Sequence, residues 1–247
     1  MDHTNNSCCC GEAEYFSGCL ICGAPITYRA ESSIQTCSIC HKEQLTNAVC
    51  ENGHFICDAC HSYGTYAPVI TTLRDSTEKD ALLLLEKIMD LPSVHMHGPE
   101  HHAIVPCVLL TAFRNNGEHM NYDAALSEIC KRAKQVPGGT CGYWGVCGAA
   151  AGAGIFMSVM TGSGPLHKDA WPFPQKLVSV ILSKLADVGG PRCCKRTSRI
   201  AIEEAIRFYR QFSSVKIPLS SVLCKYFEDM HNLFVDISGK TMDNISM

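Results

Sequence analysis

The chain has 247 residues, a formal net charge of -3 at pH 7 and a mean hydropathy of +0.03. This near-neutral balance is ordinary for a soluble protein and gives no sign of a nucleic-acid or membrane partner. The longest apolar run, residues 146–161, is too short and too rich in glycine and alanine for a membrane span. The length allows two domains, and we favour that division.

Seventeen cysteines set the composition apart. Residues 1–14 are polar and lack the pattern of a secretion signal, so we expect a cytoplasmic protein whose thiols serve metal or redox chemistry. We expect these residues to form a flexible leader. Its consecutive Cys8, Cys9 and Cys10 have no assigned role, and a metal-delivery or redox arm is the alternative.

Regularly spaced cysteine pairs between residues 15 and 66 predict a metal-binding module. A Cys-x2-Cys turn presents two thiolates to one tetrahedral ion, and this segment has too few apolar residues to fold without metal. The eight candidate ligands are Cys19, Cys22, Cys37, Cys40, Cys50, His54, Cys57 and Cys60. The simplest pairing places one ion on the first four and another on the last four, with an interleaved pairing as the alternative. Zinc is the expected metal, and iron or disulfides are the other possibilities.

The end of this module, CENGHFICDACH, resembles the zinc-binding hairpin and helix start of treble-clef and RING-like modules. That resemblance implies a zinc site, and it gives little support for ubiquitin transfer. Between residues 11 and 62 the only arginine and lysine are Arg29 and Lys42, against six acidic residues, which is the reverse of a nucleic-acid-binding surface. A structural role or the docking of a protein partner is therefore the interpretation for this module.

Helical patterns dominate after residues 63–73, which we interpret as a linker or short strand. We predict an all-α domain over residues 74–238, so the expected fold class is mainly α, with a small N-terminal zinc-ribbon or treble-clef module. The predicted helices cover residues 81–89 after a cap at Asp75 and Glu78, a segment from Pro99 to about 115, a segment after the N-cap Asn121, then 148–160, 172–185, a segment after the break at 189–191, and a last one after Pro218. Residues beyond 239 look frayed.

The most constrained stretch is the glycine-rich segment 138–164. Gly148 and Gly152 stack four apart on a helix and allow another backbone or a ligand to approach closely. An interior glycine costs about 1 kcal/mol relative to alanine, which favours close packing or a site. Cys141 and Cys147 stand at the entrance to this helix. A tightly packed central helix with incidental thiols is the alternative.

Histidines gather in the segment SVHMHGPEHH. Glu100, His101 and His102 fall on the first turn of the helix that begins at Pro99, and His97 precedes it. Imidazole and carboxylate groups together suit a transition metal or proton transfer near neutral pH. We therefore predict a ligand set of His97, Glu100 and His101. The alternative is a group of solvent-exposed histidines at a helix end.

The charge balance turns basic between residues 192 and 216. Cys193 and Cys194 stand there at a helix start among cations, which stabilises thiolate and raises reactivity or metal affinity. Arg196 and Arg199 are candidates for binding an anion. The pattern from Ile202 onward predicts that one face of the same helix packs in the core.

The helical half resembles the redox-active family named after its C-GCAxxG-C-C cysteine pattern. The match runs from His101 to Cys194 and includes Cys107, the sequence CGAAAG from Cys147, and the later cysteines. The family motif has a cysteine where this chain has Gly148. The MHGPEHH stretch with this half also resembles an uncharacterised domain family with cysteine-rich leaders, sometimes associated with methyltransferases. Both resemblances imply an α-helical domain with clustered thiols.

Three functions remain open. The first is a cytoplasmic metal-binding redox protein, with zinc and an iron-sulfur cluster as cofactors. The second is an enzyme acting on a small anionic or sulfur-containing substrate, with a cysteine nucleophile and His101 or His102 as base. The third is an adaptor that docks a partner through its zinc module. The candidate thiolate site consists of Cys147, Cys193 and Cys194 with Cys107 or Cys141. A redox partner or a methyltransferase is the expected protein partner.

Overall fold

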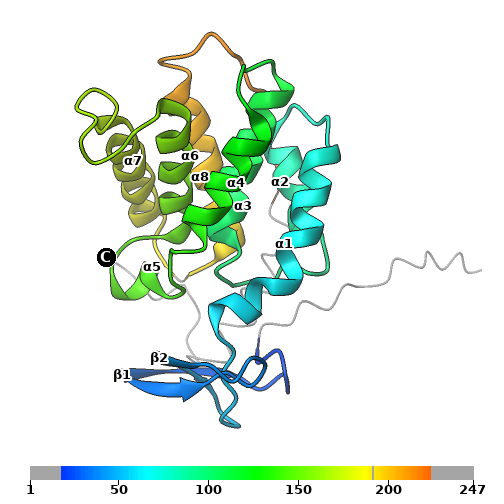
Figure 1. The fold of residues 1–247 in the computed structure, drawn as a ribbon, viewed down its shortest axis with the longest axis vertical. Helices are drawn as coiled ribbons and strands as arrows, with labels where there is room; N and C mark the ends of the chain where they lie inside the picture. Colours follow the sequence, from blue (N-terminus) through cyan, green and yellow to red (C-terminus); the bar gives the residue numbers. More distant parts are fainter. Residues whose placement is uncertain (1–17, 191, 224–247) are drawn as a thin grey trace, which may run out of the picture. The chain divides into compact units, whose positions relative to one another are not determined.

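The computed structural model describes residues 18–190 and 192–223, which form two units that divide after Ile56 (Figure 1). The described chain is mainly helical, with a small two-stranded sheet in its N-terminal unit, and this confirms the predicted fold class. The expected leader 1–14, most of the helix predicted after Pro218 and the tail beyond 239 lie outside the described residues. Within the described ranges no helix has the length and apolar character needed to cross a membrane.

The N-terminal unit is built on one β-hairpin. Strands β1 (Ile26–Thr36) and β2 (Glu43–Cys50) pair antiparallel, with Ile26 opposite Cys50 and an irregularity between Tyr28 and Ser33. Most side chains of β1 are exposed, and Ile34 is 66% exposed. A unit that buries so little apolar surface needs a further source of stability, such as a bound metal ion.

The second unit contains eight helices within the residues that the structure describes. They are α1 (Asp58–Asp75), α2 (Ala81–Met89), α3 (His101–Asn115), α4 (Tyr122–Ala133), α5 (Thr140–Tyr143), α6 (Gly148–Thr161), α7 (Pro172–Val188) and α8 (Cys194–Tyr209). The predicted helix 81–89 is confirmed, and so is the predicted N-cap Asn121, whose side chain accepts a hydrogen bond from the Ala124 N–H.

The expected linker or strand at residues 63–73 is wrong, because this segment belongs to α1. The predicted module boundary at residue 66 therefore falls inside a helix. Pro68 lies on the exposed side of α1, where it interrupts one backbone hydrogen bond without ending the helix. The opposite side has a helical spacing of three and four residues, and its buried members are Ser62, Thr65, Val69 and Leu73.

Helices α3 and α6 form the centre of the helical unit, where the sequence suggested α6 alone. Every residue of α3 from His101 to Phe113 is buried, and α3 packs against α1, α2, α4, α6 and α8 (Figure 1). The ring of Phe113 lies 5.1 Å from that of Phe156 on α6 and 4.4 Å from that of Tyr209 on α8, measured between centroids. These contacts join the three helices in one apolar core.

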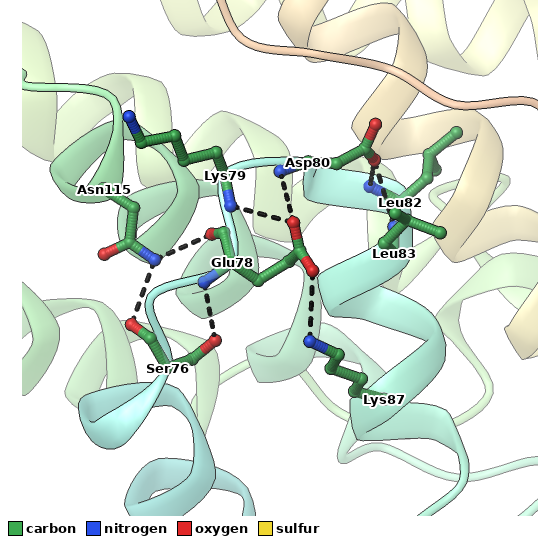
Figure 2. A network of polar contacts seen from close by, with 8 residues as sticks. All are labelled: Ser76, Glu78, Lys79, Asp80, Leu82, Leu83, Lys87 and Asn115. Carbon is green, nitrogen blue, oxygen red and sulfur yellow. Dashed lines mark hydrogen bonds and ion pairs between the residues drawn. The ribbon is translucent and has the colours of Figure 1, made fainter.

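The start of α2 is fixed by Asp80 (Figure 2). Its Oδ1 accepts hydrogen bonds from the backbone N–H groups of Leu82 at 2.9 Å and Leu83 at 3.1 Å. The predicted cap at Asp75 and Glu78 is therefore wrong. The helix begins at Ala81, so the residue directly before it satisfies the free N–H groups.

Glu78 stabilises the loop ahead of this cap instead. Its carboxylate accepts hydrogen bonds from the backbone N–H of Asp80 at 3.1 Å and from Lys87 Nζ at 3.0 Å (Figure 2). Asn115, at the end of α3, donates to the carbonyl oxygens of Ser76 at 3.0 Å and Glu78 at 2.7 Å. The loop between α1 and α2 is thereby tied to α3.

Candidate metal centre and thiol cleft

Four side chains of the N-terminal unit converge on one point, namely Cys19, Cys22, Cys50 and His54. The Sγ atoms of Cys22 and Cys50 are 3.7 Å apart, and His54 Nδ1 lies 3.3 Å from Cys22 Sγ and 3.6 Å from Cys50 Sγ. Ligand atoms around a tetrahedral zinc ion, with Zn–S bonds of about 2.3 Å, stand about 3.8 Å apart. The group therefore has the spacing of a metal site, and all its cysteines are free thiols.

Two tight turns present these ligands. In the first, the N–H of Gly23 bonds the Cys19 carbonyl oxygen at 2.8 Å, and in the second the N–H of Gly53 bonds the Cys50 carbonyl oxygen at 2.8 Å. Both glycines have a positive φ, 72° and 80°, which residues with a side chain rarely adopt. The N–H of Asn52 also donates to Cys50 Sγ at 3.2 Å, a contact that supports a thiolate ligand.

Hydrogen bonds further favour the thiolate form of Cys22. A bond with the Ala24 backbone and one from the Asn52 side chain lower the pKa of the Cys22 thiol to about 6. The Nδ2 atom of Asn52 lies 3.6 Å from the sulfur. A thiol that ionises readily near neutral pH is a better metal ligand than one at its ordinary pKa.

The grouping differs from the simplest sequential pairing and follows the interleaved one. Cys50 and His54 join Cys19 and Cys22 because the hairpin register pairs Ile26 with Cys50, which brings the first turn beside the end of β2. Cys37 and Cys40 occupy a turn of their own, in which the His41 N–H bonds the Cys37 carbonyl oxygen at 2.9 Å. Cys57 and Cys60 belong to the helical unit, where Cys57 is the N-cap residue of α1 and Cys60 lies in its first turn.

In the helical unit, a cleft of about 490 Å³ gathers most of the predicted thiol site. Cys141, Cys147 and Cys194 line it, together with two histidines and two arginines, namely His101, His102, Arg192 and Arg196. The histidines come from the first turn of α3, and Cys194 and Arg196 from the first turn of α8. Cys147 and Arg192 precede α6 and α8, and Cys141 lies in α5. Helix N-termini carry partial positive charge, so they add to the arginines in favouring an anion or a thiolate in this cleft.

His102 owes its position to glycine. A Cβ atom at Gly148 would overlap the His102 ring, and one at Gly152 would lie 2.8 Å from Pro106 Cδ. The small residues of α6 therefore allow a close approach to α3, as their spacing predicts. His102 Nδ1 lies 3.0 Å from the Val136 carbonyl oxygen and so donates to it, which leaves Nε2 as the acceptor. Burial lowers the pKa of His102, so the neutral ring is favoured.

The two cysteines at the start of α8 differ from each other. Cys193 is buried outside the cleft lining, and its Sγ accepts a hydrogen bond from the Arg196 N–H at 3.4 Å as the N-cap of α8. Cys194 lines the cleft. Burial of the thiol raises the pKa of Cys194 to about 12, although the charge of Arg192 acts in the opposite direction. The expectation that nearby cations make Cys194 a reactive thiolate is wrong, because desolvation outweighs them.

Cys107 does not line the cleft. It lies on α3 with its Sγ 3.7 Å from that of Cys130 on α4. The Cys130 contact and burial raise the pKa of the Cys107 thiol. Among the described residues, the groups spaced to hold a metal ion include none of Cys107, Cys141, Cys147, Cys193 and Cys194.

Arg199 is also removed from the cleft. Its guanidinium makes a two-point ion pair with Glu86 on α2, with Nε 2.6 Å from Oε1 and Nη2 2.8 Å from Oε2. Both side chains are nearly buried, at 9% and 12% exposure. Arg199 therefore joins α8 to α2 and does not line the cleft, although the sequence suggested it as an anion-binding residue. Arg192 lines the cleft instead.

The histidines that contact Glu100 are not the ones that the sequence suggested. His95 Nδ1 lies 3.0 Å from Glu100 Oε1, and His61 Nδ1 on α1 lies 3.4 Å from Oε2. His97 is absent from this group, and burial, followed by the charge of Arg192, lowers its pKa to about 3. His61 was missed because its only signal in the sequence is its place directly after Cys60.

His101 has a different role from that of a ligand. Its Nε2 lies 3.0 Å from the His95 carbonyl oxygen, and Ser198 Oγ lies 3.4 Å from its Nδ1. Burial lowers the pKa of His101 to about 4, so the ring is neutral and donates through Nε2. His101 thus holds the backbone of the loop that carries His95. The predicted set of His97, Glu100 and His101 is replaced by His61, His95 and Glu100.

Comparison with known proteins finds one family. The profile of a family of unknown function, DUF5714, matches residues 69–232. The matched segment begins within α1 and includes α2 to α8, with the cleft and Glu100, but neither the N-terminal unit nor His61. No redox family is named by this comparison. No curated protein and no solved structure matches the chain.

Proposed function

We propose that this chain, which belongs to the DUF5714 family of unknown function, is a zinc-binding protein with a reactive-thiol cleft in its helical unit. The convergence of Cys19, Cys22, Cys50 and His54 carries the zinc part of this proposal. Three thiolates and an imidazole are a donor set that zinc takes in closed structural sites. The ion would fold the N-terminal unit, which has little apolar core of its own.

A second zinc ion is proposed on the remaining cysteines of the eight-residue set. Once the first ion takes its four ligands, the chain still offers Cys37, Cys40, Cys57 and Cys60. Four thiolates complete a tetrahedral zinc site, and both pairs have the Cys-x2-Cys spacing.

Metal analysis of the full chain, purified without oxygen, tests this proposal. We expect two tightly bound zinc ions associated with the cysteine sets. Cys22→Ser should lose the first of them, and Cys40→Ser the second. Cys130→Ser is the matched control, because it removes a thiol outside both sets and should leave the zinc content unchanged.

Iron with visible absorption in place of zinc would contradict the metal assignment. An unchanged zinc content in Cys22→Ser would contradict the ligand assignment. Inductively coupled plasma mass spectrometry and an absorption spectrum on the same sample separate these outcomes.

The cleft supports a second function, a thiol-dependent reaction on a small anionic or sulfur-containing molecule. Cys141 and Cys147 line it with His102, whose Nε2 can accept a thiol proton, and with Arg192 and Arg196, which favour an anion. The iron-sulfur alternative is less well supported, since Cys107 pairs with Cys130 and the cleft thiols do not form a group spaced for one metal centre.

Two alkylating agents of similar size probe this cleft. Iodoacetate is anionic and iodoacetamide is neutral, so cations beside the thiol should favour iodoacetate. We expect Arg192→Gln to lower the ratio of the two alkylation rates at Cys147 several-fold. Arg207→Gln is the matched control, because Arg207 is an exposed arginine of α8 outside the cleft lining. An equal ratio in wild type and Arg192→Gln would contradict an anion-binding cleft.

A protein partner, either a redox protein or a methyltransferase, and a cytoplasmic location remain parts of the proposal. They rest on the acidic N-terminal module and on the many cysteines of the chain. Co-purification of a partner with wild type but not with Cys22→Ser would support docking through the zinc module.

A further inference from the structure

We propose that the helical unit holds a divalent transition-metal ion on His61, His95 and Glu100, separate from the cysteine sites. The three side chains offer ligand atoms that all lie within 4.8 Å of one another. They come from α1, from the loop before α3 and from the residue that precedes α3, so tertiary structure assembles the group.

Within the part of the chain that the structure describes, two buried polar atoms of this group lack a hydrogen-bond partner. Glu100 is fully buried, and neither its Oε2 nor His61 Nδ1 has a hydrogen-bond partner among the described residues. These two atoms are 3.4 Å apart. Two ligand atoms on a tetrahedral ion with bonds of about 2.0–2.1 Å are separated by about 3.3 Å, so a shared ion fits between them.

A buried carboxylate also needs a compensating charge. Desolvation of a carboxylate costs several kcal/mol unless a cation or several donors offset it. The donors to Glu100 in the structure are the N–H of His95 at 3.2 Å and the His95 ring at 3.0 Å, both on Oε1. A divalent ion at Oε2 supplies the compensating charge on the side of the carboxylate that no donor of the described residues reaches.

The surrounding chain is shaped to hold this carboxylate. A Cβ atom at Gly98 would overlap the Glu100 carboxylate, so only glycine leaves it room. His101 donates to the His95 carbonyl oxygen at 3.0 Å and so holds the backbone of the loop that carries His95. His61 and His95 keep side-chain exposures of 22% and 20%, which leaves a path for an ion from solvent. Second-shell contacts of this kind orient ligands at metal sites.

The donor set indicates which metal class would bind. Two imidazoles and one carboxylate bind zinc in catalytic sites and ferrous iron in oxygenases, and both leave a coordination position open. The site would therefore bind a divalent first-row transition ion with room for a further small ligand, unlike the closed cysteine site.

The test compares zinc content in the full chain after saturation with Zn²⁺ and removal of loosely bound ions. We expect wild type to hold one more zinc ion per chain than His61→Ala or Glu100→Gln. His119→Ala is the matched control, because His119 is exposed and belongs to no ligand group, and it should equal wild type. Circular dichroism checks that each variant is folded, and His61→Ala is decisive if Glu100→Gln does not fold.

Cobalt titration of the metal-free protein separates this site from the cysteine sites. Cobalt bound by thiolates gives strong charge-transfer absorption, whereas an imidazole and carboxylate site gives only weak bands. Cys19→Ser with Cys22→Ser should lose part of the strong absorption and retain the weak bands. A wild-type zinc content in folded His61→Ala would overturn the proposal and leave Glu100 as a carboxylate held by histidines alone.

Discussion

Gly148 shows how a single missing side chain shapes the cleft. Its position beside the His102 ring leaves no space for a methyl group. We expect Gly148→Ala to lower the free energy of unfolding by about 1–3 kcal/mol, because overpacking outweighs the gain in helix propensity. Chemical denaturation measures this change.

Gly142→Ala provides the comparison for that prediction. Nothing lies within 4 Å of a Cβ atom built at Gly142, which belongs to α5. We expect this variant to be neutral or slightly more stable. Equal destabilisation by both substitutions would show that the His102 contact is not the cause.

Cys194 allows a prediction about pH. Burial raises the pKa of its thiol to about 12, so the thiolate is scarce at neutral pH and increases with pH. The rate of Cys194 alkylation by iodoacetamide should therefore rise about tenfold per pH unit between pH 7 and pH 10. Peptide mass spectrometry of the native protein measures this rate. A rate that levels off below pH 9 would contradict the raised pKa.

At the level of single residues, the sequence predicts ligand types better than ligand partners. The spacing around Cys19 and His54 identifies metal ligands, because a turn of that length is a local property. The partner of each pair depends on the register of a hairpin, and His61 meets Glu100 only through the packing of α1 against α3. Such contacts between distant residues leave no trace in local spacing.

Among the elements, α2 offers a clear test of capping. Asp80 accepts hydrogen bonds from two N–H groups at the start of α2 and from the Ser220 N–H at 2.6 Å. Asp80→Ala should therefore lower the free energy of unfolding by about 1–2 kcal/mol. Asp75→Ala is the control, since Asp75 is exposed, and it should change stability by less than about 0.5 kcal/mol. If Asp75→Ala were the more destabilising of the two variants, the helix cap would lie at Asp75, as the sequence predicts.

The helices with clear apolar periodicity are the ones that the sequence predicts well. α4 and α6 begin where their caps and glycines indicate, and Ile202 and Ile206 face the core as expected. α1 was missed because its buried face includes the hydroxyl side chains of Ser62 and Thr65 and its exposed face carries a proline. Those residues weaken the helical pattern, and only packing against the other helices reveals it.

For the whole molecule, the contrast between the two units predicts different responses to a chelator. The N-terminal unit buries little apolar surface, whereas the helical unit has a large core. Arg29 and Lys42 are exposed already, so trypsin cleavage after them is limited by the folded backbone of the N-terminal unit. A chelator should unfold that unit and make this cleavage at least about tenfold faster, while the helical signal in circular dichroism persists.

Cys22→Ser should reproduce this cleavage without chelator, and Cys130→Ser should not. If the helical signal disappears at the same chelator concentration as cleavage begins, metal supports the whole chain rather than its N-terminal unit alone.

Three consecutive residues at the start of α3 face three different neighbours. Glu100 meets His61 and His95, His101 meets Ser198 and the His95 carbonyl oxygen, and His102 meets the Val136 carbonyl oxygen. One inserted or deleted residue rotates the two flanking parts of a helix by about 100° relative to each other. Length changes in this stretch would therefore misdirect all three side chains together, whereas a single substitution removes the contacts of one side chain only.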